Sequence, residues 1–165
     1  MRKSVLFLAT CALSSSLLVS SCKENKKTSK PIKVEFKKEG ERTLLKPSND
    51  SIYSKFEIEI SEDEYETQRG LMDRYEMANN RGMLFIFPNV QPRSFYMKNT
   101  YIPLDIIYID EDKSIVSIQK NAKPLDESSL PSGLPAKYVL EINAGLTQQL
   151  NIEVGDKIEF TRTDK

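Results

Sequence analysis

Charged and polar side chains interrupt the apolar segments in the second half of this 165-residue chain, and they are the residues that could carry chemistry. Two carboxylates, Asp105 and Glu141, lie inside the otherwise apolar stretches LDIIYI and YVLEI. A buried charge without a partner is very costly, so each acid either faces solvent or is paired. The cations expected to pair with them are Arg74 and Lys98. The sequence therefore predicts a polar cluster at one end of a folded domain.

Three consecutive polar residues, Lys98 to Thr100, lie between two apolar segments and add hydrogen-bond donors to this cluster. Donors of this kind favour a small anionic or sugar-like ligand. The candidate ligand-binding residues are Arg74, Lys98, Asn99, Thr100, Asp105 and Glu141. A purely structural role, in which the same groups form ion pairs and hydrogen bonds that close one end of the domain, is the competing interpretation.

An enzyme is the alternative function. Asp105 and Glu141 would then act as a carboxylate pair, one protonated and one ionised, as in a glycoside hydrolase. The chain has no histidine, which excludes Ser-His-Asp and Cys-His nucleophile systems and removes the commonest transition-metal ligand. We therefore expect no metal site, no cofactor and no covalent chemistry, with a carboxylate-dependent hydrolase as the alternative.

The N-terminal segment predicts export and lipidation. A basic head at residues 1–3 precedes an apolar run over residues 4–18, which is typical of a signal peptide and short for a membrane-spanning helix. The sequence LVSSC, which ends at Cys22, resembles a bacterial lipobox. That resemblance implies cleavage before Cys22 and attachment of lipid to its thiol; a plain secretory signal is the alternative. We expect a membrane-anchored protein of the bacterial cell envelope that faces the periplasm or the cell surface.

The chain divides into three parts: a signal peptide at 1–21, a lipid anchor and flexible basic tether at 22–50, and a β domain at 51–165. The tether holds nine basic and five acidic residues after Cys22 and too little apolar surface to offset the entropy of ordering. The β domain holds 13 basic and 19 acidic residues, a balance of about −6. An acidic domain without a basic stripe argues against nucleic acid as a partner. We expect a monomer.

The hydrophobic pattern of the domain predicts mainly strands. Residues 54–60, SKFEIEI, alternate as a half-buried strand does, with Glu57 and Glu59 facing solvent. Ser61 is expected to cap a helix that ends at Gly70, whose lack of a Cβ suits a left-handed helix end. Further strands are predicted at 82–87, 93–98, 104–110, 113–120, 137–142 and 157–161, loops at 88–92 and 121–135, and a short helix at 144–150 that Asn143 caps. The expected fold is mainly β: a compact sandwich or jelly roll, or a partly closed barrel, with one helix and one short helix.

Several motifs are similar to those of the DUF192 family. They are GLMDR at 70–74, GMLFIF at 82–87, FYMKNTYIPLDIIYID at 95–110, YVLEINAG at 138–145 and VGDKIEF at 154–160. The resemblance covers residues 52–161 and implies a compact, mainly β fold, but no reaction. Tyr96 stands where the family motif usually has tryptophan. We expect a lipid-anchored protein whose β domain binds a small molecule or a partner without covalent chemistry.

Overall fold

The structure is a computed structural model that describes residues 34–45 and 52–163. The expected signal peptide, Cys22 and most of the tether lie outside the described residues, so the lipobox prediction stays a prediction. Within the described ranges, no helix is both long enough and apolar enough to cross a membrane.

Seven strands and two short helices make up the described chain. They are β1 (Gly40–Leu45), β2 (Ile52–Ser61), α1 (Glu64–Arg69), β3 (Arg81–Phe95), β4 (Leu104–Ile109), β5 (Ile115–Ala122), β6 (Leu130–Asn143), α2 (Leu146–Gln149) and β7 (Lys157–Arg162). The strands form one sheet in the order β5-β4-β6-β3-β2-β1-β7. Neighbouring strands are antiparallel except β2 and β3, which are parallel.

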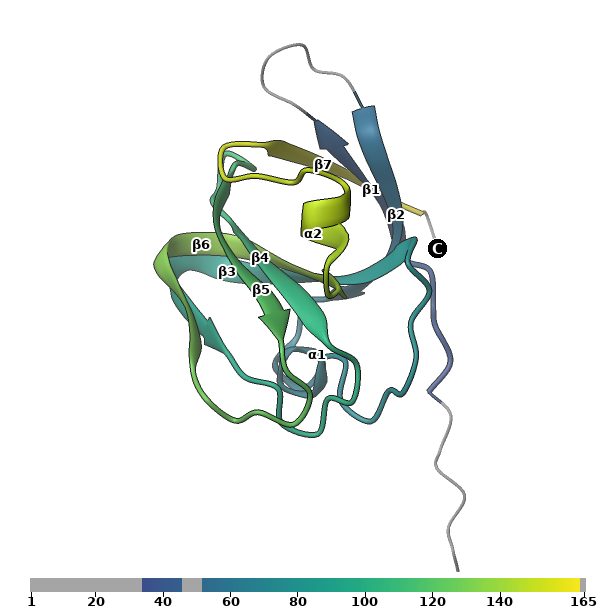
Figure 1. Ribbon diagram of the computed structural model, residues 1–165. Coiled ribbons are helices and arrows are strands. Elements are labelled where there is room, and N and C mark those ends of the chain that lie inside the picture. The colour runs from purple at the N-terminus through teal and green to yellow at the C-terminus, as the bar shows by residue number, and fades with distance from the viewer. Residues whose placement is uncertain (1–33, 46–51, 164–165) are drawn as a thin grey trace, which may run out of the picture. The chain divides into compact units, whose positions relative to one another are not determined.

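The sheet curls until its two edge strands approach each other (Figure 1). Ser114, just before β5, forms a β-bridge with Lys157 at the start of β7. The N–H of Ile115 donates to the carbonyl of Asp156 at 2.8 Å, which adds to this contact. The predicted mainly β fold with a partly closed barrel is therefore confirmed.

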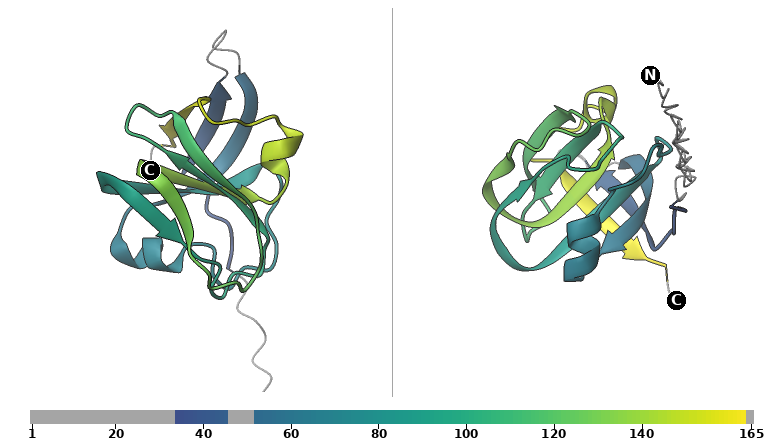
Figure 2. Two further views of the ribbon diagram at one scale, coloured as in Figure 1. Left: turned by 60° about the vertical axis from the view of Figure 1, so that its left-hand side comes forward. Right: turned by 90° about the horizontal axis from the view of Figure 1, so that it is seen from below.

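Apolar side chains cover both faces of the curled sheet. The first core contains residues from β2 to β7, such as Phe56, Ile107 and Ile142, and Leu146 of α2 packs into it. The second core lies on the other face of β3, β4 and β6 and includes Phe85. Strand β4 is buried on both faces throughout its length. The helices lie well apart, on different sides of the sheet (Figure 2).

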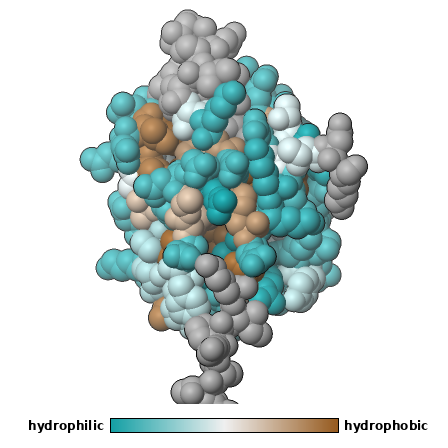
Figure 3. Space-filling view, turned by 90° about the vertical axis from the view of Figure 1, so that its right-hand side faces the viewer, coloured by the Kyte–Doolittle hydropathy of each residue, from teal (hydrophilic) through white to brown (hydrophobic). Residues whose placement is uncertain are grey.

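The face of the molecule drawn in Figure 3 is mostly polar. Seen from the side in Figure 3, hydrophilic side chains surround only small apolar areas. Eight large apolar or aromatic side chains are nevertheless exposed among the described residues, and five of them lie between Tyr65 and Tyr101. Within that stretch, Tyr75 and Tyr101 stack with their ring centroids 4.5 Å apart.

Two strands are longer than the sequence predicts. The expected loop at 88–92 is wrong, because β3 continues through Pro88 and Pro92. The pairing of β3 with β6 shifts register between Ile86 and Gln91, and bulges of this kind accommodate prolines that cannot donate a hydrogen bond. The expected loop at 121–135 is likewise shorter, because β6 begins at Leu130.

The folded domain begins before residue 51, inside the expected tether. Strand β1 lies between β2 and β7, where Gly40 pairs with both Ile58 and Arg162. Backbone hydrogen bonds on both sides hold this strand despite its polar composition. A Cβ at Gly40 would lie 2.7 Å from the carbonyl oxygen of Thr161, so the close approach of β7 requires glycine.

Both helix caps differ from the predicted ones. Asp63, not Ser61, caps α1, and its carboxylate accepts from the N–H of Glu66 at 2.7 Å. Gly70 has a positive φ of 47° at the helix end, but its ψ of −132° lies outside the left-handed helical region that the sequence predicts. Helix α2 begins after Gly145 without a side-chain cap, and the amide of Asn143 instead donates to the carbonyl of Met77.

Candidate functional site

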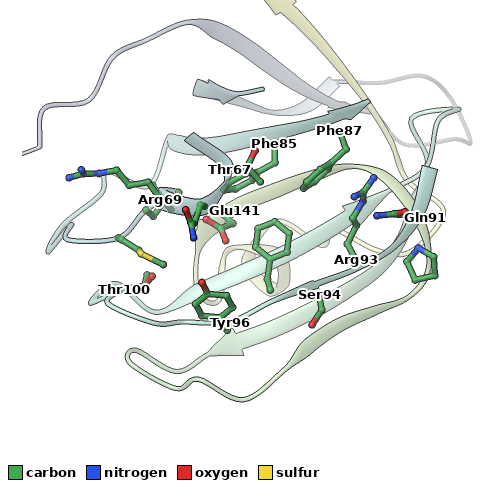
Figure 4. Close-up of a pocket in the computed structure, with 16 residues that line it drawn as sticks. Thr67, Arg69, Phe85, Phe87, Gln91, Arg93, Ser94, Tyr96, Thr100 and Glu141 are labelled. Atoms are coloured by element: carbon green, nitrogen blue, oxygen red, sulfur yellow. The ribbon is translucent and has the colours of Figure 1, made fainter. Parts of the chain in front are cut away.

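A cavity of about 320 Å³ lies among α1, the loop that follows it, the part of β3 from Phe85 onward and the C-terminal end of β6 (Figure 4). Helix α1 contributes no buried residue, so it covers the sheet loosely. Aromatic side chains of β3 form much of the wall, and Thr67, Thr100 and Glu141 supply polar groups. This volume is at the lower end of the range typical of small-molecule sites.

Glu141 lies at the floor of this cavity, with its carboxyl directed into it (Figure 4). It is only 5% exposed, and its cross-strand neighbours are Met83 and Ile106, which are apolar. No hydrogen bond or ion pair joins its carboxyl to another residue of the described chain. Burial without a cation raises the pKa of Glu141 to about 8. At neutral pH the acid is therefore mostly protonated, and it can both donate and accept a hydrogen bond.

Four aromatic residues line the cavity: Phe85, Phe87, Phe95 and Tyr96. Phe85 and Phe95 meet edge to face with their centroids 5.0 Å apart. The guanidinium of Arg93 lies over the ring of Phe87, 3.9 Å from its centroid. Tyr96 is 43% exposed, so it joins the cavity to the surface.

Two threonines place hydroxyl groups in the cavity lining. The Thr67 hydroxyl on α1 lies 3.2 Å from that of Ser61 at the end of β2. Thr100 is buried, and its hydroxyl donates to the carbonyl of Lys98 at 3.2 Å. Each hydroxyl retains a lone pair that can accept a hydrogen bond from a ligand.

The structure brings only two of the six predicted site residues to this cavity, Thr100 and Glu141. Lys98 and Asn99 are exposed in the turn that precedes β4, where Asn99 has a positive φ of 52°. The expectation that one polar mouth gathers all the candidate residues is therefore wrong.

Asp105 lies on the face of the sheet opposite to Glu141. It pairs with Ile142 across β4 and β6, whereas Glu141 pairs with Ile106, and successive side chains of a strand point to opposite faces. The fully buried Asp105 accepts hydrogen bonds from the N–H of Asn121 at 2.8 Å and from the N–H and hydroxyl of Thr147 at 3.0 and 2.7 Å. Asp105 thus holds α2 and β5 to the sheet, and the two acids cannot share one cleft.

Arg74 is paired with Glu59, not with Asp105 or Glu141. Its Nη1 lies 2.5 Å from Glu59 Oε2, and both side chains are more than nine-tenths buried. This contact is an ion pair without hydrogen-bond geometry, since neither Glu59 Oε2 nor Arg74 Nε has a hydrogen-bond partner among the described residues. Glu59 is predicted to face solvent, but Arg74 covers it and the N–H of Lys37 donates to its Oε1 at 3.0 Å.

A row of side chains explains why Arg74 leaves Glu141 unpaired. Glu59, Met83, Glu141 and Ile106 lie directly across from one another on β2, β3, β6 and β4. Adjacent strands are about 4.8 Å apart, so the two acids are separated by about 10 Å. Met83 fills the space between them with an apolar side chain.

Sequence reasoning missed the aromatic wall. Phe85 and Phe87 are two residues apart on β3, a spacing that places both on one face of a strand. The pattern alone assigned them to the core, because nothing in it shows that α1 leaves a space above them. In the part of the chain that the structure describes, no group of three or more acidic, cysteine or histidine side chains could hold a metal ion.

Comparison with known proteins identifies the family. The model of the DUF192 family, described as "Uncharacterized ACR", matches residues 45–160. A UPF0127 protein of Thermococcus sibiricus is 30% identical over 108 residues, which cover 62% of this chain and 65% of the relative, so the chain spans less than two thirds of that protein. A UPF0127 protein of Pyrococcus abyssi is 33% identical over 91 residues, or 51% of this chain and 73% of the relative.

Two crystal structures share the fold. A protein of unknown function from Novosphingobium aromaticivorans has a TM-score of 0.68 and 39% identity, covering 72% of this chain and 83% of its own. A protein from Sinorhizobium meliloti, which carries the provisional name of a transcription regulator, has a TM-score of 0.71 and 38% identity, covering 77% and 98%. From residue 45 to residue 160, this chain belongs to the uncharacterised DUF192 family, also called UPF0127.

Proposed function

We propose that the domain is a non-catalytic binding module whose cavity takes a small, sugar-like molecule. The observation that supports this function best is an acid without a protein partner at the floor of an aromatic-lined cavity. The Glu141 carboxyl borders the cavity, so a ligand there can supply the hydrogen-bond partner that the described residues do not provide.

The lining suits a molecule that has one apolar face and several hydroxyl groups. The exposed ring of Tyr96 offers a flat surface on which the C–H face of a sugar ring can pack. Glu141, Thr67 and Thr100 offer hydrogen-bonding groups to its hydroxyls. A small anion, the other ligand class expected from the sequence, is disfavoured because the arginines near the cavity are engaged by other groups and the domain carries about six more acidic than basic residues.

A hydrolase is not supported by this arrangement. Glycoside hydrolysis needs two carboxyl groups on either side of one bond, and Asp105 and Glu141 lie on opposite faces of the sheet. The acidic balance of the domain disfavours nucleic acid as a partner.

We also propose that a lipid on Cys22 anchors the protein in a bacterial cell envelope. The basic head, the apolar run and the LVSSC sequence support this location. Labelling cells with a radioactive fatty acid tests it: wild-type protein should carry the label and fractionate with membranes, and the C22A variant should do neither. Labelled C22A protein would contradict the proposal.

Calorimetric titration of the full chain with methyl glucoside, methyl galactoside and N-acetylglucosamine tests the binding function. We expect at least one sugar to bind, and Tyr96→Ala to weaken that binding about tenfold through lost contact with its ring. Tyr65→Ala is the matched control, since Tyr65 is 66% exposed and does not line the cavity. No binding of any sugar at millimolar concentration, or equal losses in the two variants, would contradict the proposal.

A further inference from the structure

We infer that the sugar-like ligand carries a positively charged amino group, which the carboxylate of Glu141 binds at the floor of the cavity. This inference rests on the proposed function and adds the chemical class of the ligand to it. It is drawn from the groups that surround Glu141, the ring faces of the wall and the charge of the domain.

Every cation near the cavity is already engaged elsewhere. Arg74 pairs with Glu59, and Arg93 donates to the backbone carbonyls of Asn89 and Ala136. Arg69 lines the cavity with its stem, while its guanidinium points away from Glu141 (Figure 4) and donates to the hydroxyl of Tyr65 at 3.1 Å. Glu141 is therefore an acid for which the described chain provides no positive charge.

The aromatic wall favours a cation over an anion. Ring faces carry negative electrostatic potential and attract ammonium and guanidinium groups. Phe87 already takes the guanidinium of Arg93 on its face, which shows that a cation can be accommodated in this wall. Residues 51–165 also carry about six more acidic than basic groups, so the surrounding field attracts positive ligands.

The other ionisable groups around Glu141 do not supply the positive charge that the ligand would bring. On β4, the hydroxyl of Tyr108 donates to the carbonyl of Leu130; burial raises the pKa of that tyrosine, and the proximity of Glu141 adds to the rise. Arg93 of β3 and Tyr96, which follows β3, also line the cavity, and beyond Met83 the next acid is the paired Glu59. An ammonium group that enters the cavity would thus form its ion pair with Glu141 itself.

Binding of a cation requires Glu141 to lose its proton, so affinity should depend on pH. The pKa of the empty site is about 8, and a bound ammonium favours the ionised acid. Affinity for an amine should therefore rise between about pH 6 and about pH 8, as long as the amine itself stays charged. A neutral sugar gains nothing from ionisation and should not show this rise.

Matched glucosides test the inference on the full chain. Methyl 6-amino-6-deoxyglucoside and methyl 2-amino-2-deoxyglucoside are titrated against methyl glucoside near pH 6 and near pH 8. The variant is Glu141→Gln, in which an uncharged amide of the same shape replaces the acid. The control is Glu111→Gln, which alters an exposed acid in the β4–β5 turn, outside the cavity.

We expect at least one amino glucoside to bind about tenfold more tightly than methyl glucoside near pH 8, corresponding to one charge-assisted contact. This advantage should shrink near pH 6 and disappear in Glu141→Gln, and it should persist in Glu111→Gln. Circular dichroism shows whether each variant is folded. If Glu141→Gln does not fold, the pH dependence of the wild-type protein decides the result.

Two other outcomes would contradict the inference, and they differ in what they imply for the proposed function. Equal binding of all three glucosides to the wild-type protein, or an amine advantage that survives in Glu141→Gln, would overturn the inference and leave the proposed function standing. Failure of all three glucosides to bind at either pH would contradict the inference and count against the sugar-binding function as well.

Discussion

Asp105 and Glu141 are two acids on adjacent strands of one sheet, and their surroundings are opposite. Asp105 is fully buried and accepts three hydrogen bonds that hold α2 and β5 in place. Glu141 is almost as deeply buried, has no partner among the described residues and faces a cavity. The comparison teaches that burial alone does not mark a functional acid. What distinguishes the two is whether the protein itself satisfies the carboxyl.

The largest loss of stability should come from Asp105→Ala. This change leaves the N–H groups of Asn121 and Thr147 and the Thr147 hydroxyl without an acceptor, so the free energy of unfolding should fall by about 4 kcal/mol. Urea denaturation measures the loss. Glu141→Gln should cost far less, because the protein offers its carboxyl no partner. Equal losses of stability in the two variants would contradict the distinction between an acid that the protein satisfies and one that it does not.

A second loss of stability tests the ion pair between Arg74 and Glu59, the acid that lies in the same cross-strand row as Glu141. Arg74→Met leaves Glu59 buried without its counter-charge and should destabilise the protein by about 3 kcal/mol. The double variant E59Q/R74M should recover much of this loss, since it removes both charges. Chemical denaturation of both variants gives the comparison. If the double variant is no more stable than the single one, the cost does not arise from an unpaired Glu59.

A third effect is the pH dependence that Glu141 imposes on stability. Its pKa is raised from 4.5 to about 8 by burial, so the folded state binds the proton more tightly than the unfolded state. Stability from this group is complete below about pH 4.5 and is lost as pH rises through about 8. Relative to Glu141→Gln, the wild-type protein should lose about 2 kcal/mol between about pH 5 and pH 7. Parallel urea titrations of the two proteins that show no divergence would contradict an unpaired, buried Glu141.

The smallest losses of stability are expected from removing two threonine hydroxyls, one on each face of the sheet. Thr147→Val removes a donor from the buried Asp105 and should cost about 2 kcal/mol. Thr67→Val removes a contact with Ser61 at the cavity and should cost about 1 kcal/mol or less, because water can replace it there. Thermal unfolding of the two variants provides the ranking. A larger loss in Thr67→Val would show that the cavity face is packed more tightly than the structure indicates.

Much of the fold could be predicted from apolar patterns. The β4–β5 hairpin, the strand at 54–60 and the final strand occur where alternation and turn residues place them. The continuity of β3 through Pro88 and Pro92 could not be predicted, because bulges opposite β6 accommodate both prolines. Strand β1 was missed because its stability comes from two neighbouring strands, one of which is more than a hundred residues away.

The site was less predictable than the fold. The sequence identified Asp105 and Glu141 as the unusual acids, but the face that each occupies depends on strand register, and one position reverses it. Alternation also placed Glu59 in solvent, because a sequence pattern does not show that Arg74 and the backbone of Lys37 cover that side chain. The cavity itself depends on how loosely α1 covers β3, which is a property of the assembled structure.

The position of β1 has a consequence for how the domain is made. Gly40, near the start of the described chain, pairs with Arg162 near its end. During synthesis β1 and β2 can form a hairpin early, but the outer edge of β1 keeps unsatisfied backbone groups until β7 has left the ribosome. The last strand to be made is therefore the one that completes the sheet, so a chain truncated before β7 should be prone to aggregate through that open edge.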